Sequence, residues 1–182
     1  MQAGAQRKGQ GGRPKAYEPE AVLEASLELF WTRGFSDPSV TEIARAAGLN
    51  RPSLSAGFGD KRSLYLTVLD RFVGDMSAAM GRALAHPDLR KALKAFFAEA
   101  IRLYDSDELG GRGCLVLCTA PAEACRDDEI RRALASTLAA IDAALVARLR
   151  QAKAGGMKID PASLGAALSA ILHSIALRSR AG

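Results

Sequence analysis

Residues 39–61 read SVTEIARAAGLNRPSLSAGFGDK and contain two short helical segments placed back to back. The first opens with a capping-box pattern, in which Ser39 is followed three residues later by Glu42. Gly48 ends that segment by allowing a left-handed turn, and the second begins at Asn50 or Arg51 with Pro52 in its first turn. Helices of about eight residues are marginal in isolation, so we expect tertiary packing to hold both segments in place.

The spacing of small and apolar residues in this stretch is typical of a helix-turn-helix. Ala44 allows the second segment to approach, Gly48 follows four residues later, and Leu54 comes six residues after the glycine. Three further apolar residues fill the space beneath the two segments: Ile43, Leu49 and Phe58. The polar residues left outside are candidate contacts to phosphates or base edges in a major groove: Thr41, Arg51, Ser53 and Ser55. A plain helical hairpin within a bundle is the alternative, because serine caps and glycine turns are common there.

A basic arm precedes this stretch. Residues 1–16 are rich in glycine, glutamine, arginine and lysine and have no apolar period, which predicts disorder. Residues 1–15 hold four basic residues and no acidic one, within a chain of net charge +5. Lys61, at the start of the following helix, adds a charged phosphate contact. The basic arm, the spacing and the outer polar residues together indicate double-stranded DNA as a partner.

The remainder of the chain predicts an all-α fold. Apolar residues make up 48% of the sequence and aromatic residues only 5%, and no segment shows a convincing strand pattern. Helices are expected over 17–34, 39–48, 50–58, 61–85, 88–104, 128–153 and from 161 onward. A short apolar segment, 114–120, is expected to end at Pro121. We therefore predict a disordered arm at 1–16 and an N-terminal three-helix helix-turn-helix domain at 17–62, joined by a long helix to a C-terminal helical bundle at 63–182.

The sequence offers no sign of export, membrane insertion or catalysis. No apolar core follows the basic start, as a signal peptide would require, and no apolar run is long enough for a membrane span. Three cysteines without a secretory context argue against a disulfide framework. No P-loop, dinucleotide fingerprint, nucleophile elbow or pair of histidine ligands is present. We expect a cytoplasmic protein that is not an enzyme, has no cofactor or metal site, and does not associate with membranes.

Several motifs in the first third of the chain resemble the N-terminal domain of the tetracycline-repressor (TetR) family of bacterial regulators. They occur in the family's order: GRP at 12–14, LFWTRGF at 29–35, SVTEIARAAGLNRPSL at 39–54 and FGDKRSLY at 58–65. The segment RGCLVLCTA at 112–120 also resembles the sixth helix of one branch of that family.

The resemblance implies a sequence-specific DNA-binding transcriptional regulator. It would be a repressor that binds a palindromic operator as a homodimer and is released by a small apolar ligand. The DNA contacts that the resemblance implies come from Thr41, Arg51, Pro52, Ser53 and Lys61. It also implies that Arg13 and Lys15 reach into the minor groove.

Two positions in the second helical segment depart from the family pattern. Ser55 stands where the family usually has a tyrosine that packs over a phosphate. Gly57 lies inside a helix, where glycine costs about 0.5–1 kcal/mol relative to alanine. The chain also stops at LRSRAG, 177–182, where relatives usually continue into another helix of the dimer interface. These departures support an alternative function, a helical interaction module whose helix-turn-helix no longer reads sequence.

The resemblance places a ligand site and the dimer interface in the later helices. Candidates for the ligand site are apolar or half-polar residues at helical spacing: Met76, Met80, Phe96, Phe97, Tyr104, Leu117, Cys118 and His173. For each of them the alternative is simple core packing, and Tyr104 and His173 are the candidates for a polar anchor. Gly165, Ser169 and Ala176 lie along one side of the last helix. Small residues there suit either two such helices meeting across a two-fold axis or packing within one chain.

Cys114 and Cys118 are four residues apart and share a helix face if their segment is helical. They are candidates for a redox or electrophile sensor of the repressor, because nearby Arg112 would favour a thiolate. The alternative is that both are small buried hydrophobes, the commoner role of a free cysteine. A Cys-x3-Cys pair in a chain with only two histidines is not a zinc pattern.

Overall fold

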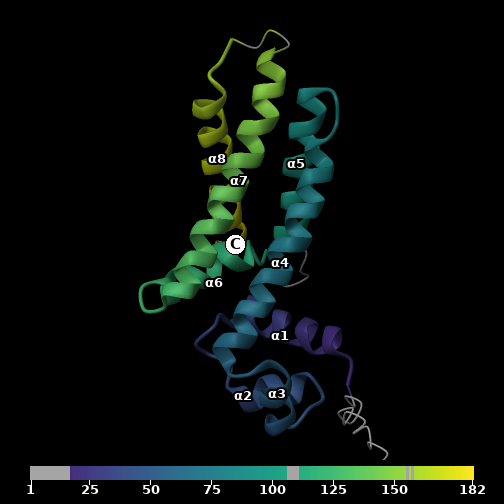
Figure 1. Ribbon diagram of the computed structural model, residues 1–182, viewed down its shortest axis with the longest axis vertical. Helices are drawn as coiled ribbons and strands as arrows, with labels where there is room; N and C mark the ends of the chain where they lie inside the picture. Colours follow the sequence, from purple (N-terminus) through teal and green to yellow (C-terminus); the bar gives the residue numbers. More distant parts are fainter. Residues whose placement is uncertain (1–16, 106–110, 155, 157) are drawn as a thin grey trace, which may run out of the picture.

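The computed structural model describes residues 17–105, 111–154, 156 and 158–182, and all regular secondary structure in this part of the chain is helical. The helices are α1 (Pro19–Arg33), α2 (Val40–Ala46), α3 (Arg51–Phe58), α4 (Lys61–Leu84), α5 (Leu89–Tyr104), α6 (Leu115–Ala124), α7 (Asp128–Ala154) and α8 (Pro161–Ala181). Figure 1 shows α1, α2 and α3 at one end of the molecule, and α5, α7 and α8 beside the outer part of α4 at the other. The all-α prediction is confirmed. The predicted arm contacts, Arg13 and Lys15, lie outside the described residues.

The first helices begin and end at the residues that the sequence analysis singles out. Pro19 is the first residue of α1, and Gly34 ends that helix with φ 78°. Both halves of the capping box of α2 are formed: the Ser39 hydroxyl accepts from the Glu42 amide at 3.2 Å, and the Glu42 carboxylate accepts from the Ser39 amide at 2.8 Å. The Asn50 side chain caps α3. These short helices therefore use side chains to satisfy main-chain groups that their first turns leave unpaired.

The helix α4 connects the two ends of the molecule and carries much of the core. Near its start, the ring centroid of Tyr65 lies 5.1 Å from that of Phe30 in α1 and 4.9 Å from that of Phe35. Farther along α4, Phe72 meets Trp31 edge to face at 4.9 Å. Such aromatic pairs contribute about 0.5–1.5 kcal/mol beyond the area they bury. Because one cluster of buried residues runs from α1 to α8, the first three helices are packed onto the rest of the molecule and not merely tethered to it.

The helix α6 is longer than the sequence predicts. It continues through Pro121 to Ala124, so the expectation that it ends at the proline is wrong. A proline inside a helix removes one main-chain hydrogen bond, here the bond to the Leu117 carbonyl. Pro121 itself is exposed, while Ala120 and Ala124 on either side are buried in a helix that packs against α1, α7 and α8. This packing offsets the lost hydrogen bond.

The small residues of α8 face the interior of the chain. Gly165, Ser169 and Ala176 are all buried, and a Cβ on Gly165 would lie 2.6 Å from a methyl carbon of Val146 in α7. Of the two uses that these residues suit, packing within one chain is therefore the one observed. Other positions of α8 expose apolar side chains, Ile171 and Leu177. By length and composition alone, α8 could also cross a membrane, and 22% of its most apolar window is buried.

Candidate nucleic-acid interface

The turn between α2 and α3 brings the two helices together at Ala44. Gly48 adopts φ 68°, which places the chain in the left-handed region that favours glycine. The Leu49 amide can then donate to the Ala44 carbonyl at 2.8 Å. Ala44 and Leu54 are only 1% and 2% exposed, and Ile43 is fully buried beside them. The predicted helix-turn-helix packing is thus present in the structure.

The predicted DNA-contact residues lie mainly on the solvent side of this unit. Thr41, Arg51, Pro52 and Ser55 are exposed, and Ser53 is half-buried. The Ser53 amide donates to the cap oxygen of Asn50 at 2.9 Å, which holds the start of α3. The structure thus brings all five residues to one unit and leaves four of them accessible to a partner.

Arg45, the basic residue in the last turn of α2, is a further candidate DNA contact that was not predicted from the sequence. It is exposed next to the turn, where its charge is available to a phosphate backbone. A basic residue directly after the small Ala44 was the available signal, because α2 buries its Ile43–Ala44 side and Arg45 follows one position later.

Lys61 is less free than the prediction supposes. Its ammonium donates to the Ser36 carbonyl at 3.0 Å and lies 4.9 Å from the centroid of the Phe35 ring. Burial lowers the pKa of Lys61, while the carboxylates of Glu123, Asp37 and Glu42 act in the opposite direction. In this conformation the side chain holds the α1–α2 connection against the start of α4, and a phosphate would share the three N–H donors of the ammonium with the Ser36 carbonyl.

Gly57 has a packing role in α3. A Cβ at this position would lie 2.0 Å from the hydroxyl oxygen of Tyr17, whose ring centroid is 6.2 Å from that of Phe58. The glycine therefore leaves room for Tyr17, which directly follows the predicted basic arm in the sequence. This contact explains why a residue that weakens helices lies in the last turn of α3.

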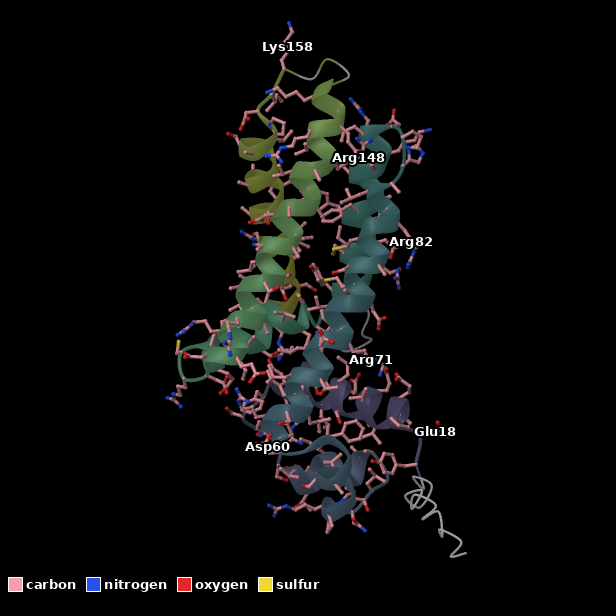
Figure 2. All side chains as sticks on the ribbon, viewed as in Figure 1. Glu18, Asp60, Arg71, Arg82, Arg148 and Lys158 are labelled. Carbon is pink, nitrogen blue, oxygen red and sulfur yellow. The ribbon has the colours of Figure 1, made fainter. Side chains whose placement is uncertain are left out.

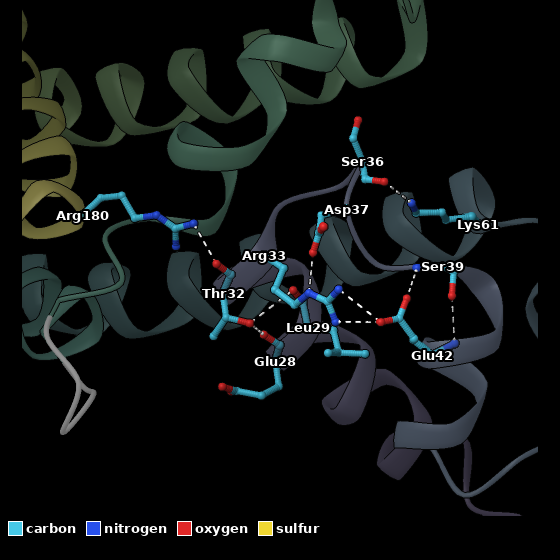
Figure 3. A network of polar contacts seen from close by, with 10 residues as sticks. All are labelled: Glu28, Leu29, Thr32, Arg33, Ser36, Asp37, Ser39, Glu42, Lys61 and Arg180. Atoms are coloured by element: carbon cyan, nitrogen blue, oxygen red, sulfur yellow. Dashed lines mark hydrogen bonds and ion pairs between the residues drawn. The ribbon is translucent and has the colours of Figure 1, made fainter.

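Arg33 connects the end of α1 to the start of α2 (Figure 3). Its two terminal nitrogens both donate to the Glu42 carboxylate at 3.1 Å, and its Nε donates to Asp37. Hydrogen bonds from Ser39, together with the Arg33 charge, lower the pKa of Glu42 to about 2. Glu42 thus acts twice, as the second half of the capping box and as the acceptor for Arg33.

A second ion-pair group joins the start of α4 to the start of α7. Arg62 donates to Asp127 at 3.0 Å and to Glu129 at 2.7 Å. The guanidinium, together with the amide groups that Asp127 caps, holds the pKa of Asp127 well below its usual range. The helix-turn-helix and the later helices are therefore connected by charge as well as by the core.

Sequence comparison assigns this unit to a known family. The profile described as "Bacterial regulatory proteins, tetR family" matches residues 22–68, which include α2, the turn and α3. Residues 22–68 belong to the tetR family. The chain is 36% identical over 107 residues to the HTH-type transcriptional repressor BdcR of Escherichia coli K12, an alignment that covers 58% of the chain and 54% of BdcR. The chain thus matches about half the length of BdcR.

Two longer matches extend the similarity to the later helices. The HTH-type transcriptional repressor ComR of Escherichia coli K12 is 27% identical over 176 residues, covering 94% of this chain and 83% of ComR. A cysteine mutant of the regulator CifR, solved with 26-bp operator DNA, has a TM-score of 0.80 at 23% identity and covers 92% of this chain and 90% of that one. The similarity to ComR thus extends beyond the helix-turn-helix into the later helices, and the CifR structure shares the fold of this chain.

The predicted ligand residues do not line a single cavity. Met76 and Met80 lie in a groove of about 400 Å³ between α1, α4 and α5, whereas His173 borders a shallow depression on α8. Tyr104 borders a third depression, between α5 and α8. The remaining predicted residues line none of these hollows: Phe96 is buried, and Phe97, Leu117 and Cys118 are half-buried.

Cys114 and Cys118 lie one turn apart at the start of α6, as predicted, but in a setting that does not favour thiolates. Burial raises the pKa of Cys114 to about 11 and also raises that of Cys118. The guanidinium that lowers the pKa of Cys118 belongs to Arg180, and burial outweighs it. Arg112, which the sequence analysis assigned to this role, pairs with Glu28 and lies over the Trp31 ring. Within the described residues, no three His, Cys, Asp or Glu side chains form a group able to hold a metal ion.

Proposed function

We propose that this regulator is a cytoplasmic repressor that binds a palindromic operator as a homodimer and leaves it when a small apolar ligand binds. The observation that carries the proposal is the exposed side of α2 and α3, where Thr41, Arg51, Pro52 and Ser55 surround a turn held by Gly48. Two such units one helical turn of DNA apart would read successive major grooves. In this proposal residues 17–62 form the DNA-binding part, 63–182 the regulatory part, and the arm at 1–16 adds minor-groove contacts.

The outward side of α8 supports a homodimer. Ile171 and Leu177 are 51% and 54% exposed, which is unusual for large apolar side chains on one helix. The neighbouring α7 contributes exposed alanines that permit close helix approach: Ala139, Ala140, Ala143, Ala144 and Ala147. Pairing α7 and α8 with the same helices of a second copy would bury this surface.

The groove between α1, α4 and α5 supports a ligand that acts on the DNA-binding end. Its apolar floor includes Trp31, Phe72, Met76 and Met80, and charged residues form its rim. Arg71 and Arg82 project from the same side of α4 at this rim (Figure 2). A ligand that enters between α1 and α4 would favour a conformation in which these helices are farther apart, which is the differential affinity that release requires.

Two buried polar atoms outside this groove offer anchors for a ligand at the separate hollows that Tyr104 and His173 border. The Tyr104 hydroxyl and the His173 Nε2 have no hydrogen-bond partner among the described residues. Burial, together with the neighbouring Cys114, raises the pKa of Tyr104, and burial lowers that of His173. Both groups are therefore neutral at pH 7 and suited to hydrogen-bond a polar atom of an otherwise apolar molecule.

The proposal is tested by selecting random duplex DNA on the purified protein and sequencing the bound fraction at moderate salt. We expect enrichment of a palindrome whose half-sites are about one helical turn apart. The enriched duplex then serves to screen apolar ligands for release. Folded protein that enriches no sequence, with binding that disappears at physiological salt, would support the interaction module.

A further inference from the structure

We propose that Arg180 is a positioning residue for DNA binding, which joins the last turn of α8 to the last turn of α1 and thereby fixes the spacing of the two helix-turn-helix units in a dimer. The inference rests on the proposed function, because it assumes that α8 lies in the dimer interface. It assigns a role in operator reading to a side chain at the far end of the sequence from α2 and α3.

The guanidinium of Arg180 binds the main chain at the end of α1. It donates to the Trp31 carbonyl and, at 3.1 Å, to the Thr32 carbonyl. Figure 3 shows the side chain reaching from α8 to Thr32. The last carbonyls of a helix have no partner within it, and a cation there also complements the helix dipole. Gly34 satisfies only the Phe30 carbonyl, at 2.9 Å, so Arg180 supplies donors that α1 itself lacks.

The end of α8 fits closely into its position. Gly113 has φ 67°, and a Cβ on it would lie 2.3 Å from the Ala176 carbonyl oxygen and 3.1 Å from the Arg180 Cβ. The Ser179 hydroxyl donates to the Tyr104 carbonyl at 2.8 Å. The indole of Trp31 in turn donates to the Gly113 carbonyl at 3.1 Å. The end of α8, the segment before α6 and the end of α1 therefore form one packed junction, in which Arg180 is held in place.

From this junction the contacts continue directly to the DNA-binding unit. Arg33 lies one residue beyond Thr32 and binds Glu42, the residue that closes the capping box of α2. Arg180 of α8 and Glu42 of α2 thus bind neighbouring residues in the last turn of α1. A shift of α8 in the dimer would move the helix-turn-helix through this route as well as through α4. Because half-sites on DNA have a fixed separation, the rigidity of the junction should determine which spacing is bound.

The same arrangement occurs once more inside the regulatory helices and provides a comparison. Arg148 of α7 is 8% exposed and donates to the carbonyls of Leu84, His86 and Pro87 at the end of α4, at 2.9–3.0 Å. This contact holds the α4–α5 turn far from α2 and α3 (Figure 2). Loss of Arg148 should therefore affect folding without changing the preferred operator spacing, whereas loss of Arg180 should affect spacing.

The first test compares Arg180→Ala with Lys94→Ala on the selected palindrome and on versions with one base pair added to or removed from its centre. Lys94 is an exposed cation of α5, outside the helix-turn-helix and outside the proposed dimer surface. We expect Arg180→Ala to weaken binding to the parent site by about tenfold, as for the loss of charge-assisted hydrogen bonds, and to reduce the preference for parent spacing. Lys94→Ala should do neither. Equal weakening on all three spacings, or an unchanged affinity, would overturn the inference.

The second test needs no operator, so it separates failure of this inference from failure of the proposed function. Hydrogen exchange is measured on the DNA-free protein for the wild type, Arg180→Ala, Arg148→Ala and the control Lys94→Ala. We expect Arg180→Ala to speed exchange in peptides covering 31–47 while the dimer mass stays unchanged. We expect Arg148→Ala to speed exchange near 84–92 instead. Unchanged exchange at 31–47 in Arg180→Ala would contradict the inference, even if no palindrome is ever enriched.

Discussion

Gly48 and Gly165 show how the two ends of the molecule differ. Gly48, in the turn between α2 and α3, has φ 68° and open space where a Cβ would lie. Gly165, in α8, has an ordinary helical backbone, and a Cβ there would collide with Val146 of α7. The first glycine is required by local backbone geometry, and the second by a neighbour nineteen residues earlier in the chain. Local backbone chemistry thus determines the turn between α2 and α3, whereas a contact between distant segments determines how closely α7 and α8 approach.

The largest expected effect concerns DNA affinity and separates the DNA-binding end from the rest of the surface. Arg51→Ala should weaken operator binding by about 1–3 kcal/mol and relax base preference, if Arg51 contacts a base edge. Lys61→Ala should weaken binding to all sequences alike and reduce the salt slope by about one. Binding titrations at several salt concentrations measure both effects, with Lys94→Ala on the exposed side of α5 as a control of equal charge change. Unaltered affinity in both variants would show that the groove assignment is wrong.

The next effect tests the close approach of α7 and α8. Gly165→Ala should destabilise the protein by about 1–3 kcal/mol, because the new methyl group overpacks against Val146. Val146→Ala removes the atom 2.6 Å away, so the double variant should lose less stability than the sum of the two single variants. Urea unfolding of the four proteins measures this coupling. Additive losses would mean that the methyl group added at position 165 does not meet the Val146 side chain.

A smaller effect tests the contact between Tyr17 and Gly57. Alanine is favoured over glycine inside a helix by about 0.5–1 kcal/mol, but in the wild type its Cβ would meet the Tyr17 hydroxyl. Tyr17→Phe removes that oxygen, after which the nearest ring carbon is 3.2 Å away. We therefore expect Gly57→Ala to stabilise the Tyr17→Phe protein and not the wild type. Thermal unfolding of both pairs measures the difference, and an equal gain in the two backgrounds would exclude the contact.

The smallest effect is a pH dependence at the start of α2. Because the pKa of Glu42 falls from 4.5 to about 2 on folding, its charge contributes stability that is fully present above pH 4.5. That contribution is lost as the pH falls from about 4.5 toward 2. The melting temperature of Glu42→Gln should therefore fall less steeply than that of the wild type across this window. Parallel curves would show that the contacts of Glu42 with Ser39 and Arg33 are absent in solution.

The contrast between the two ends also explains which features were predictable from sequence. Ser39, Gly48 and Asn50 act within a few residues of themselves, so their capping and turn roles follow from spacing alone. Pro121 was misinterpreted because the packing of Ala120 and Ala124 that carries α6 past it involves other helices. Residue spacing also could not decide whether the small residues of α8 pack within one chain or against a second copy, because that too depends on contacts with other helices. The ligand candidates share helical spacing but come from several helices, and only tertiary structure divides them among separate hollows.

The uninterrupted length of α4 has a consequence for operator choice. This helix contains 24 residues and begins directly after α3, while its later turns form one wall of the groove that holds Met76 and Met80. A rigid rod of this kind is about 36 Å long, so pivoting it by about five degrees moves its tip by about 3 Å. That displacement is close to the rise of one base pair, about 3.4 Å. Rotating α4 by about five degrees in one protomer of a dimer would therefore displace its helix-turn-helix by about one base-pair step along the DNA, and opposite rotations in both protomers would change their separation by about two steps.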